Sequence, residues 1–447
     1  MRRFATLVIG VLICLPSAAD AQVLERPVRA SERTESNVWR RLTFGVTTLG
    51  SWDDNVTADQ VVVDPSFPSQ SGYTGFADTS LRFEQGKGSQ SFSASGHGYV
   101  NAFRNVGLTP HYGSDAQAQF VGSLGRRHRI EARQDFRDEP FYTIGGFSGL
   151  RQAVEVGPSP DSNPLNGVEK RRSWAAMSRI GLASQWSPRN GLGVAYGYAA
   201  RDFRDHVGDT RAHNVSLSYN RNVGRRSMLK FNYEYTDAEF REPAGPIPSE
   251  THLADAGVNL ERRFSPTRRI VVFFGGGAVQ FRSVDRLTRE SYEVLGPSGF
   301  GTIRLDWARS WSVSVDYRRS VGTLEGMSAQ AFTTDAAMAQ LGGFVSRRVE
   351  ATFAVGYSEG KYDRQSASFR TYTGTSQMRF VLTRDWSALI SHSYNQYSLR
   401  NVDLLFASLP QRFDRNAVRV GLTLNFPVIN PREPKRPQPT ERTDASR

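Results

Sequence analysis

The sequence predicts an all-β protein: a transmembrane, antiparallel, up-and-down β-barrel of about 18 strands, with 16 as the alternative count. Three observations predict it. Apolar and polar side chains alternate along most of the chain, short and long connections alternate between these segments, and the chain has 40 Gly, 27 Phe, 16 Tyr and seven Trp. Strand side chains repeat every two residues, so this alternation gives each strand one apolar and one polar face. A hydrophobic content of 38% suits a barrel whose faces alternate between lipid and water.

The first 21 residues read as a secretory signal peptide. Arg2 and Arg3 precede an apolar run over residues 4–15, and residues 19–21 offer a small-x-small cleavage site. Cys14 is the only cysteine, so the mature chain is expected to have no disulfide and no thiolate metal site. Residues 22–41 are expected to form a short periplasmic segment. Because no later stretch is apolar enough for a transmembrane helix, insertion is expected as a closed barrel.

Residues 42–426 are expected to form the barrel, placed in the bacterial outer membrane. Eight short connections alternate with nine long ones, which puts both termini on the side of the short turns. Bacterial barrels have short periplasmic turns and long extracellular loops. A soluble sandwich or propeller also alternates, but neither a blade-like repeat nor a disulfide framework is present. The predicted long loops include residues 139–169, 237–249 and 283–298.

Individual segments have two distinct faces. In residues 229–236, Leu, Phe and Tyr alternate with Lys, Asn, Glu and Thr, and residues 311–318 repeat the pattern. The first set should face lipid and the second the lumen. Trp186, Trp307 and Trp386 lie near strand ends, as expected for an interfacial girdle.

Charged residues recur on the predicted lumen face. Opposed basic and acidic surfaces inside a pore select which solutes pass. The alternative is simple ion pairing that holds a polar interior together, and a register shift of one residue would invert the assignment. The candidate lumen-lining residues are Arg82, Glu84, Arg129, Glu131, Arg133, Arg179, Asp255, Glu261, Arg304, Asp306, Asp316, Arg318, Arg379 and Arg419.

The end of the barrel segment resembles the C-terminal signal of bacterial outer-membrane barrels. Arg419, Gly421, Leu424 and Phe426 fill its polar, glycine and two hydrophobic positions. The resemblance implies recognition by the barrel-assembly machinery, although an ordinary amphipathic strand can match so short a motif. Residues 427–447 hold five prolines among charged residues, which predicts a disordered periplasmic tail.

Residues 51–56 read Ser-Trp-Asp-Asp-Asn-Val at the exit of the first predicted strand. A first strand ending in Asp-Asn-Val, with many alternating strands and a terminal Phe after it, is similar to the β-barrel porin 2 family of outer-membrane proteins. The resemblance implies a porin-like barrel associated with exopolysaccharide or capsule export. Asp53, Asp54 and Asn55 either bind a cation at the outer rim or cap the strand by hydrogen-bonding their own backbone.

Neither a catalytic nor a cofactor or metal site is expected, and the chain is not expected to be an enzyme. His97 and His392 lie on predicted strands beside serines, but match no lipase or protease motif. Residues 275–277, three glycines, lie inside an apolar run with no helix after it. They are therefore expected to relieve crowding or bend the barrel wall rather than to hold phosphate.

These features predict a channel for a hydrophilic solute, with a saccharide or polysaccharide implied by the resemblance. Barrels of roughly 16 to 18 strands leave an aqueous channel, which residues 139–169 are expected to narrow. One alternative is a general or anion-favouring diffusion porin, in line with the formal charge of +12. Another is a plugged barrel that acts as a surface adhesin or scaffold. Expected partners are outer-membrane lipid and lipopolysaccharide, the barrel-assembly machinery, a saccharide solute and a periplasmic export partner, without nucleic acid; the oligomeric state is left open.

Overall fold

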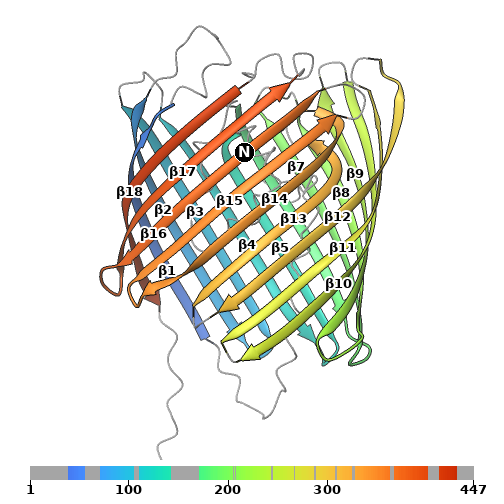
Figure 1. Ribbon diagram of the computed structural model, residues 1–447, viewed down its shortest axis with the longest axis horizontal. Helices are drawn as coiled ribbons and strands as arrows, with labels where there is room; N and C mark the ends of the chain where they lie inside the picture. The colour runs from blue at the N-terminus through green and yellow to red at the C-terminus, as the bar shows by residue number, and fades with distance from the viewer. Residues whose placement is uncertain are drawn as a thin grey trace, which may run out of the picture.

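In the computed structural model the chain forms one antiparallel sheet of 18 strands that closes on itself (Figure 1). Consecutive strands are neighbours throughout, and β1 (Trp39–Asp53) pairs with both β2 (Gly72–Lys87) and β18 (Arg412–Ile429). Closure leaves no free sheet edge along the seam between the first and last strands. The predicted fold class is confirmed, with 18 strands rather than 16.

The remaining strands follow one another in sequence order. They are β3 (Gln90–Arg104), β4 (His111–Leu124), β5 (His128–Phe141), β6 (Arg171–Ser184), β7 (Asn190–Phe203), β8 (Thr210–Asn222), β9 (Ser227–Glu242), β10 (Gly245–Ser265), β11 (Arg268–Val284), β12 (Ser291–Trp307), β13 (Trp311–Leu324), β14 (Ser328–Ser346), β15 (Val349–Tyr362), β16 (Ser368–Val381) and β17 (Trp386–Arg400). The structure describes residues 39–55, 71–104, 110–141, 171–204, 206, 208–242, 245–265, 267–285, 288–307, 310–324, 328–362, 367–400 and 412–429.

The barrel is three residues longer at each end than predicted. Trp39 already pairs with Gly86, so residues 39–41 belong to β1 rather than to an N-terminal segment. Leu42 pairs with Ile429, so residues 427–429 extend β18 rather than begin the tail. The predicted signal peptide, residues 22–38 and the tail beyond residue 429 lie outside the described residues.

The connections differ between the two ends of the barrel. At one end they are short, as predicted: only residues 88–89 separate β2 from β3. At the other end, two of the predicted long loops are corrected, because β9 and β10 are separated by residues 243–244 alone, and β11 and β12 by residues 285–290.

Proline explains this error in the loop prediction. Pro248 and Pro297 suggest loops in the sequence, yet both lie within strands. β10 pairs with β11 only from Ser249 onward, and β12 pairs with β13 only from Gly299 onward. Each proline therefore lies where its strand has one partner, and an edge position tolerates the missing N–H group.

Each strand presents one apolar face to the outside. On β9, Phe231 and Tyr233 are exposed and alternate with Lys230, Asn232 and Glu234. The same outward series runs through most strands, and its members include Leu81, Phe120, Ile180, Leu217, Phe274, Ile303, Val315, Phe353, Ile390, Val420 and Leu422. None of the described residues forms a helix long and apolar enough to cross a membrane.

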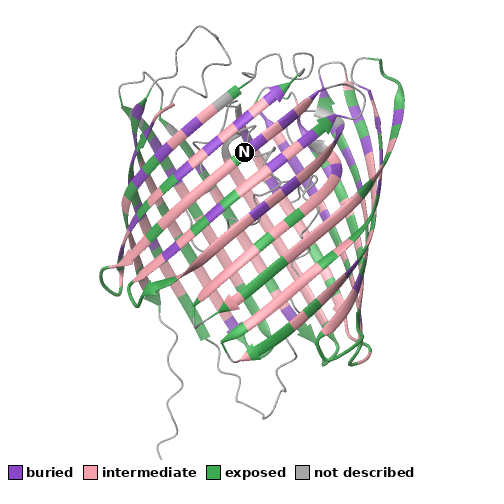
Figure 2. Ribbon diagram, viewed as in Figure 1, coloured by how far each residue is buried: buried purple, intermediate pink, exposed green. Residues whose placement is uncertain are grey.

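Burial is uneven along the barrel. Buried side chains concentrate in the half of the wall that carries the long connections, whereas the half with the short turns is mostly half-buried or exposed (Figure 2). Phe203, Phe281, Phe332 and Phe369, all in the first half, are at most 2% exposed. The two halves of the interior therefore differ in how tightly they are packed.

Candidate functional site

The concave inner wall of the barrel brings together charges from distant strands. Arg318 of β13 interacts electrostatically with Glu234 of β9 and Asp255 of β10. Strands β10 to β12 lie between β9 and β13, so this approach crosses the inside of the barrel. Asp255 accepts a 2.7 Å hydrogen bond from Asn232 Nδ2, which orients its carboxylate. Both Asp255 and Arg318 were predicted to line the lumen, and the structure brings them into one cluster.

Two aromatic rings lie among these charges. The rings of Phe273 and Phe300 are half-buried, with centroids 4.8 Å apart, and Lys230 Nζ lies 5.9 Å from the Phe273 centroid. Together, Lys230, Asp255, Phe273, Phe300 and Arg318 are called the lumen patch below. It combines an apolar platform with charges of both signs.

Glycines make room for the platform. A Cβ atom at Gly275 would collide with the Phe300 ring and with the Ala256 carbonyl oxygen, and one at Gly257 would lie 2.9 Å from Phe300 Cζ. The Phe300 ring therefore lies close to the wall only because both positions lack a side chain. This agrees with the prediction that residues 275–277 relieve crowding.

Most of the other predicted lumen residues form local pairs on the same wall. Arg82 pairs with Glu84 at 2.9 Å, and Arg304 with Asp306 at 2.9 Å. The two members of each pair are two residues apart on one strand, so their side chains lie on the same face. The further contacts are Glu131 with Gln119, Arg133 with Asp135, Glu261 with Arg263 and Arg269, Asp316 with Thr302, Arg379 with Ser387, and Arg419 with Ser393. Arg179 of β6 instead interacts electrostatically with Glu234 of β9, with two strands between them. For Arg129 no partner is described.

A hairpin narrows the interior at the end with the long connections. Beyond Arg319, β13 no longer pairs with β12, and the ends of β13 and β14 lie against β10 and β11 instead. Val321 and Ala331 join a buried cluster with Phe281 and Tyr292, and the Ala331 N–H donates a 3.1 Å hydrogen bond to Tyr292 Oη. This inward hairpin, of which residues 319–324 and 328–333 are described, was not predicted. The predicted constriction, residues 139–169, lies almost entirely outside the described residues.

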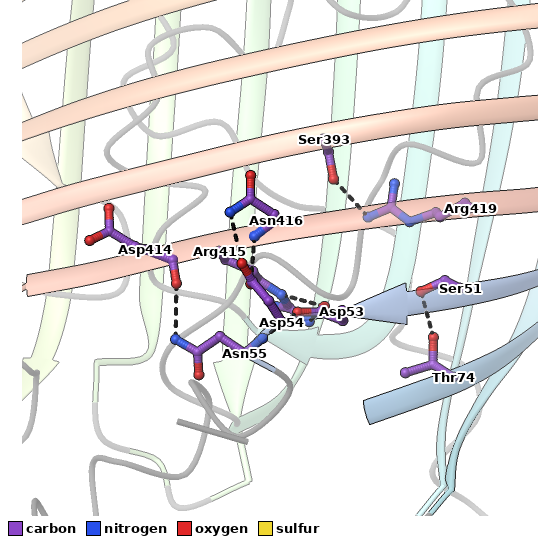
Figure 3. A network of polar contacts seen from close by, with 10 residues as sticks. All are labelled: Ser51, Asp53, Asp54, Asn55, Thr74, Ser393, Asp414, Arg415, Asn416 and Arg419. Atoms are coloured by element: carbon purple, nitrogen blue, oxygen red, sulfur yellow. Dashed lines mark hydrogen bonds and ion pairs between the residues drawn. The ribbon is translucent and has the colours of Figure 1, made fainter. Parts of the chain in front are cut away.

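The Asp-Asp-Asn motif closes the barrel seam (Figure 3). Asp53 accepts a 2.6 Å hydrogen bond from Arg415 Nε, and both side chains are buried. Asp54 accepts 2.7 Å bonds from the backbone and side-chain nitrogens of Asn416. Asn55 donates from its N–H to Asp53 Oδ1 at 2.9 Å, which is the predicted capping of the strand end. The other contacts of this motif are with residues of β18, and the sequence did not predict these contacts.

Gly421 of the predicted assembly signal lies at the same seam. A Cβ atom there would collide with the Thr48 carbonyl oxygen and with Leu49 of β1. Val420 and Leu422 beside it are exposed on the outer face, whereas Arg419 is buried on the inner face. The glycine therefore serves the closure of β1 on β18, in addition to any role as a recognition motif.

His97 and His392, the two histidines beside serines, lie on different strands of the wall. His97 pairs across the sheet with Ser80 and Asp115, but Ser80 Oγ is turned toward Gly45. His392 lies on the outer face of β17 beside exposed Ile390. In the part of the chain that the structure describes, no group of three or more His, Cys, Asp or Glu residues is placed to hold a metal.

Comparisons with known proteins give structural matches only. No family model matches the sequence. A search of curated proteins also finds no match. Among solved structures, Pseudomonas aeruginosa OpdL has 11% identity and a TM-score of 0.46, covering 87% of this chain and 99% of its own. P. aeruginosa OccK2 (OpdF), in complex with glucuronate, has 9% identity and a TM-score of 0.46, covering 87% and 98%. Acinetobacter baumannii OccAB4 has 8% identity and a TM-score of 0.45, covering 88% and 99%.

The closed sheet and its apolar outer face indicate in which membrane the chain lies. A closed sheet satisfies every backbone group within a bilayer, and its outer face carries the exposed apolar series described above. An even number of antiparallel strands with short turns at one end is typical of bacterial outer-membrane barrels. The chain is an outer-membrane β-barrel.

Proposed function

We propose that the barrel is an outer-membrane channel for a hydrophilic solute, and that this solute is a saccharide or a polysaccharide. A closed barrel of 18 strands is wide enough for an aqueous lumen. The interior of this one carries charged side chains along its length, as in pores that select solutes by charge.

The lumen patch is the observation that carries the saccharide proposal. A pyranose ring has an apolar face of C–H groups and a rim of hydroxyls. Phe273 and Phe300 offer an apolar platform, while Asp255, Lys230 and Arg318 offer hydrogen-bonding groups around it. Apolar surface with a few placed polar groups is the usual composition of a site that orients a small ligand.

A role in exopolysaccharide export is the finer part of the proposal. It rests on the resemblance of residues 51–56 to the β-barrel porin 2 family. An extended chain of sugars would pass the lumen patch one unit at a time. The energy source and a periplasmic partner would have to lie outside this chain.

Single-channel conductance in a planar bilayer tests the proposal. We expect stable conductance of the refolded protein, and transient block when neutral or acidic oligosaccharides are added to one side. Phe273→Ala should weaken the block by about tenfold, because it removes one ring of the apolar platform and a buried Phe side chain contributes roughly 1.5 to 3 kcal/mol. Phe274→Ala is the matched control, since Phe274 is the next residue on β11 and is exposed on the outer face.

Two outcomes would contradict the proposal in different ways. Conductance without any block by saccharides would favour a general or anion-favouring porin. No conductance from a folded, heat-modifiable barrel would favour a closed barrel that acts as a surface scaffold. The tightly packed half of the interior and the inward hairpin are the observations in favour of that second candidate.

A further inference from the structure

The short turns of the barrel carry repeated arginines. Three of these turns have the same sequence pattern, in which an exposed apolar residue is followed by one small residue and then by two arginines. We call these three turns, each with its pair of arginines, the arginine turns. They are Arg126-Arg127 after Leu124, Arg225-Arg226 after Val223, and Arg347-Arg348 after Val345.

The same order recurs in other short turns with different residues. Arg189 follows Trp186, Arg268 follows Phe264, and Arg384 follows Leu382. Each of these apolar residues is at least 51% exposed. The pattern therefore runs around the barrel, since these turns join strands from β4 to β17.

The arginine turns are exposed and form no ion pair among the described residues. Among the described residues, no carboxylate forms an ion pair with any of their six guanidinium groups, and all six residues are exposed. At the opposite end some arginines are paired, as Arg172 is with Asp138 and Arg282 with Glu293, whereas no ion pair is described for the exposed Arg104 and Arg289. The arginine turns thus present positive charge to the surroundings without a carboxylate paired to it.

The position of the arginine turns relative to the bilayer indicates what they bind. Leu124, Val223 and Val345 lie on the outer face, where they belong in the hydrocarbon or at its boundary. The arginines lie in the turns that directly follow these apolar residues, at the end of the barrel wall, where the lipid phosphates border the hydrocarbon. A guanidinium group binds phosphate through two parallel hydrogen bonds.

We propose that the arginine turns bind anionic phospholipid headgroups of the periplasmic leaflet. The spacing favours lipid over a soluble polyanion because the apolar residue of each turn holds its arginines at the bilayer surface. This inference concerns the outer rim and is independent of the proposed transport activity. Conductance provides a separate readout for the latter.

The experiment measures lipid preference around the full-length refolded protein in phosphatidylcholine vesicles. Energy transfer from tryptophan, with Trp186 and Trp386 at this rim, reports contact with dansyl-labelled phosphatidylglycerol or dansyl-labelled phosphatidylcholine. We expect roughly fivefold enrichment of the anionic lipid at low salt, decreasing as salt is added. A variant with all six arginines of the arginine turns changed to Gln should lose most of it.

The matched control changes six cations at the opposite end to Gln, namely Arg172, Arg282, Arg319, Lys361, Arg370 and Arg412. It should keep the enrichment, and resistance to trypsin together with heat-modifiable migration verifies that both variants are folded. Equal transfer to both lipids, or an unchanged preference in the arginine-turn variant, would overturn the proposal. So would binding of soluble polygalacturonate to the six arginines without any preference for phosphatidylglycerol.

Discussion

Arg415 of β18 and Asp53 of β1 form a buried ion pair across the barrel seam, with Arg415 Nε 2.6 Å from Asp53 Oδ2 and side-chain exposures of 2% and 0%. A buried charge must be compensated by a partner, because taking it out of water is costly. The stability of the pairing between β1 and β18 therefore depends on these two side chains.

Asp53→Ala should destabilise the barrel by about 3 to 5 kcal/mol, since it leaves the Arg415 guanidinium buried without its carboxylate. The measurement is equilibrium unfolding in urea in detergent micelles, followed by tryptophan fluorescence. Asp335→Ala is the control: its carboxylate lies 3.8 Å from Arg319 and accepts a hydrogen bond from Tyr317 Oη, but both side chains of the ion pair are more than a third exposed, so the loss should stay at about 1 kcal/mol. Equal losses in both variants would show that burial of the seam pair has no energetic consequence.

Gly421→Ala should destabilise the seam by about 1 to 3 kcal/mol through overpacking, because the new methyl group collides with the backbone of Thr48. Unfolding of the purified protein separates this effect from recognition during assembly in the cell. Gly50→Ala is the matched control at the same seam, since nothing lies within 4 Å of a Cβ atom there. If Gly421→Ala were as stable as Gly50→Ala, the collision would be relieved by a small shift of β1.

Arg318→Gln should shift the channel toward cations by roughly twofold in permeability ratio, because it removes a positive charge that faces the lumen. Asp255→Asn should shift it the other way. Reversal potentials in a potassium chloride gradient measure both. Arg319→Gln serves as control, since this neighbouring side chain pairs with Asp335. A shift as large in the control as in Arg318→Gln would argue against a special place for Arg318 in the lumen.

Tyr292→Ala should raise conductance, because the side chain both packs in the buried cluster and accepts the hydrogen bond from Ala331 that holds the inward hairpin. Without this contact the ends of β13 and β14 are freer to leave the lumen. Leu295→Ala, on the same strand and 75% exposed, should leave conductance unchanged. A Tyr292→Ala channel with unaltered conductance would mean that the constriction lies elsewhere.

The alternation of side chains was sufficient to predict the number of strands and their direction. Phe231 and Tyr233 on one face and Asn232 and Glu234 on the other appear in the structure as the sequence suggested. The predicted loops failed where Pro248 and Pro297 lie in strands with a single partner. A sequence does not indicate which stretch of a strand is an edge.

Of the lumen patch, the charged residues Asp255 and Arg318 were predicted, but the two aromatic rings were not. Aromatic residues were assigned to lipid, yet Phe273 and Phe274 are consecutive, so one of them must face the interior. That signal was available in the sequence. The approach of Arg318 to Glu234 was not, because it depends on the curvature of the wall across three intervening strands.

Arg415 could also have been found. It is four residues before Arg419, so the two share a face, and Arg419 was among the predicted lumen residues. Its partner was out of reach of sequence reasoning, because Asp53 is 362 positions away. Only the pairing of the first strand with the last brings them together.

This separation has a consequence for the order of folding. The seam joins the beginning of the barrel to its end, so β1 has an unpaired edge until β18 arrives. Contacts so distant along the chain form slowly, because the whole intervening loop must be closed first. A chain that ends before residue 412 would lack Arg415, Asn416 and Gly421 together, and would keep its first strand open to other chains.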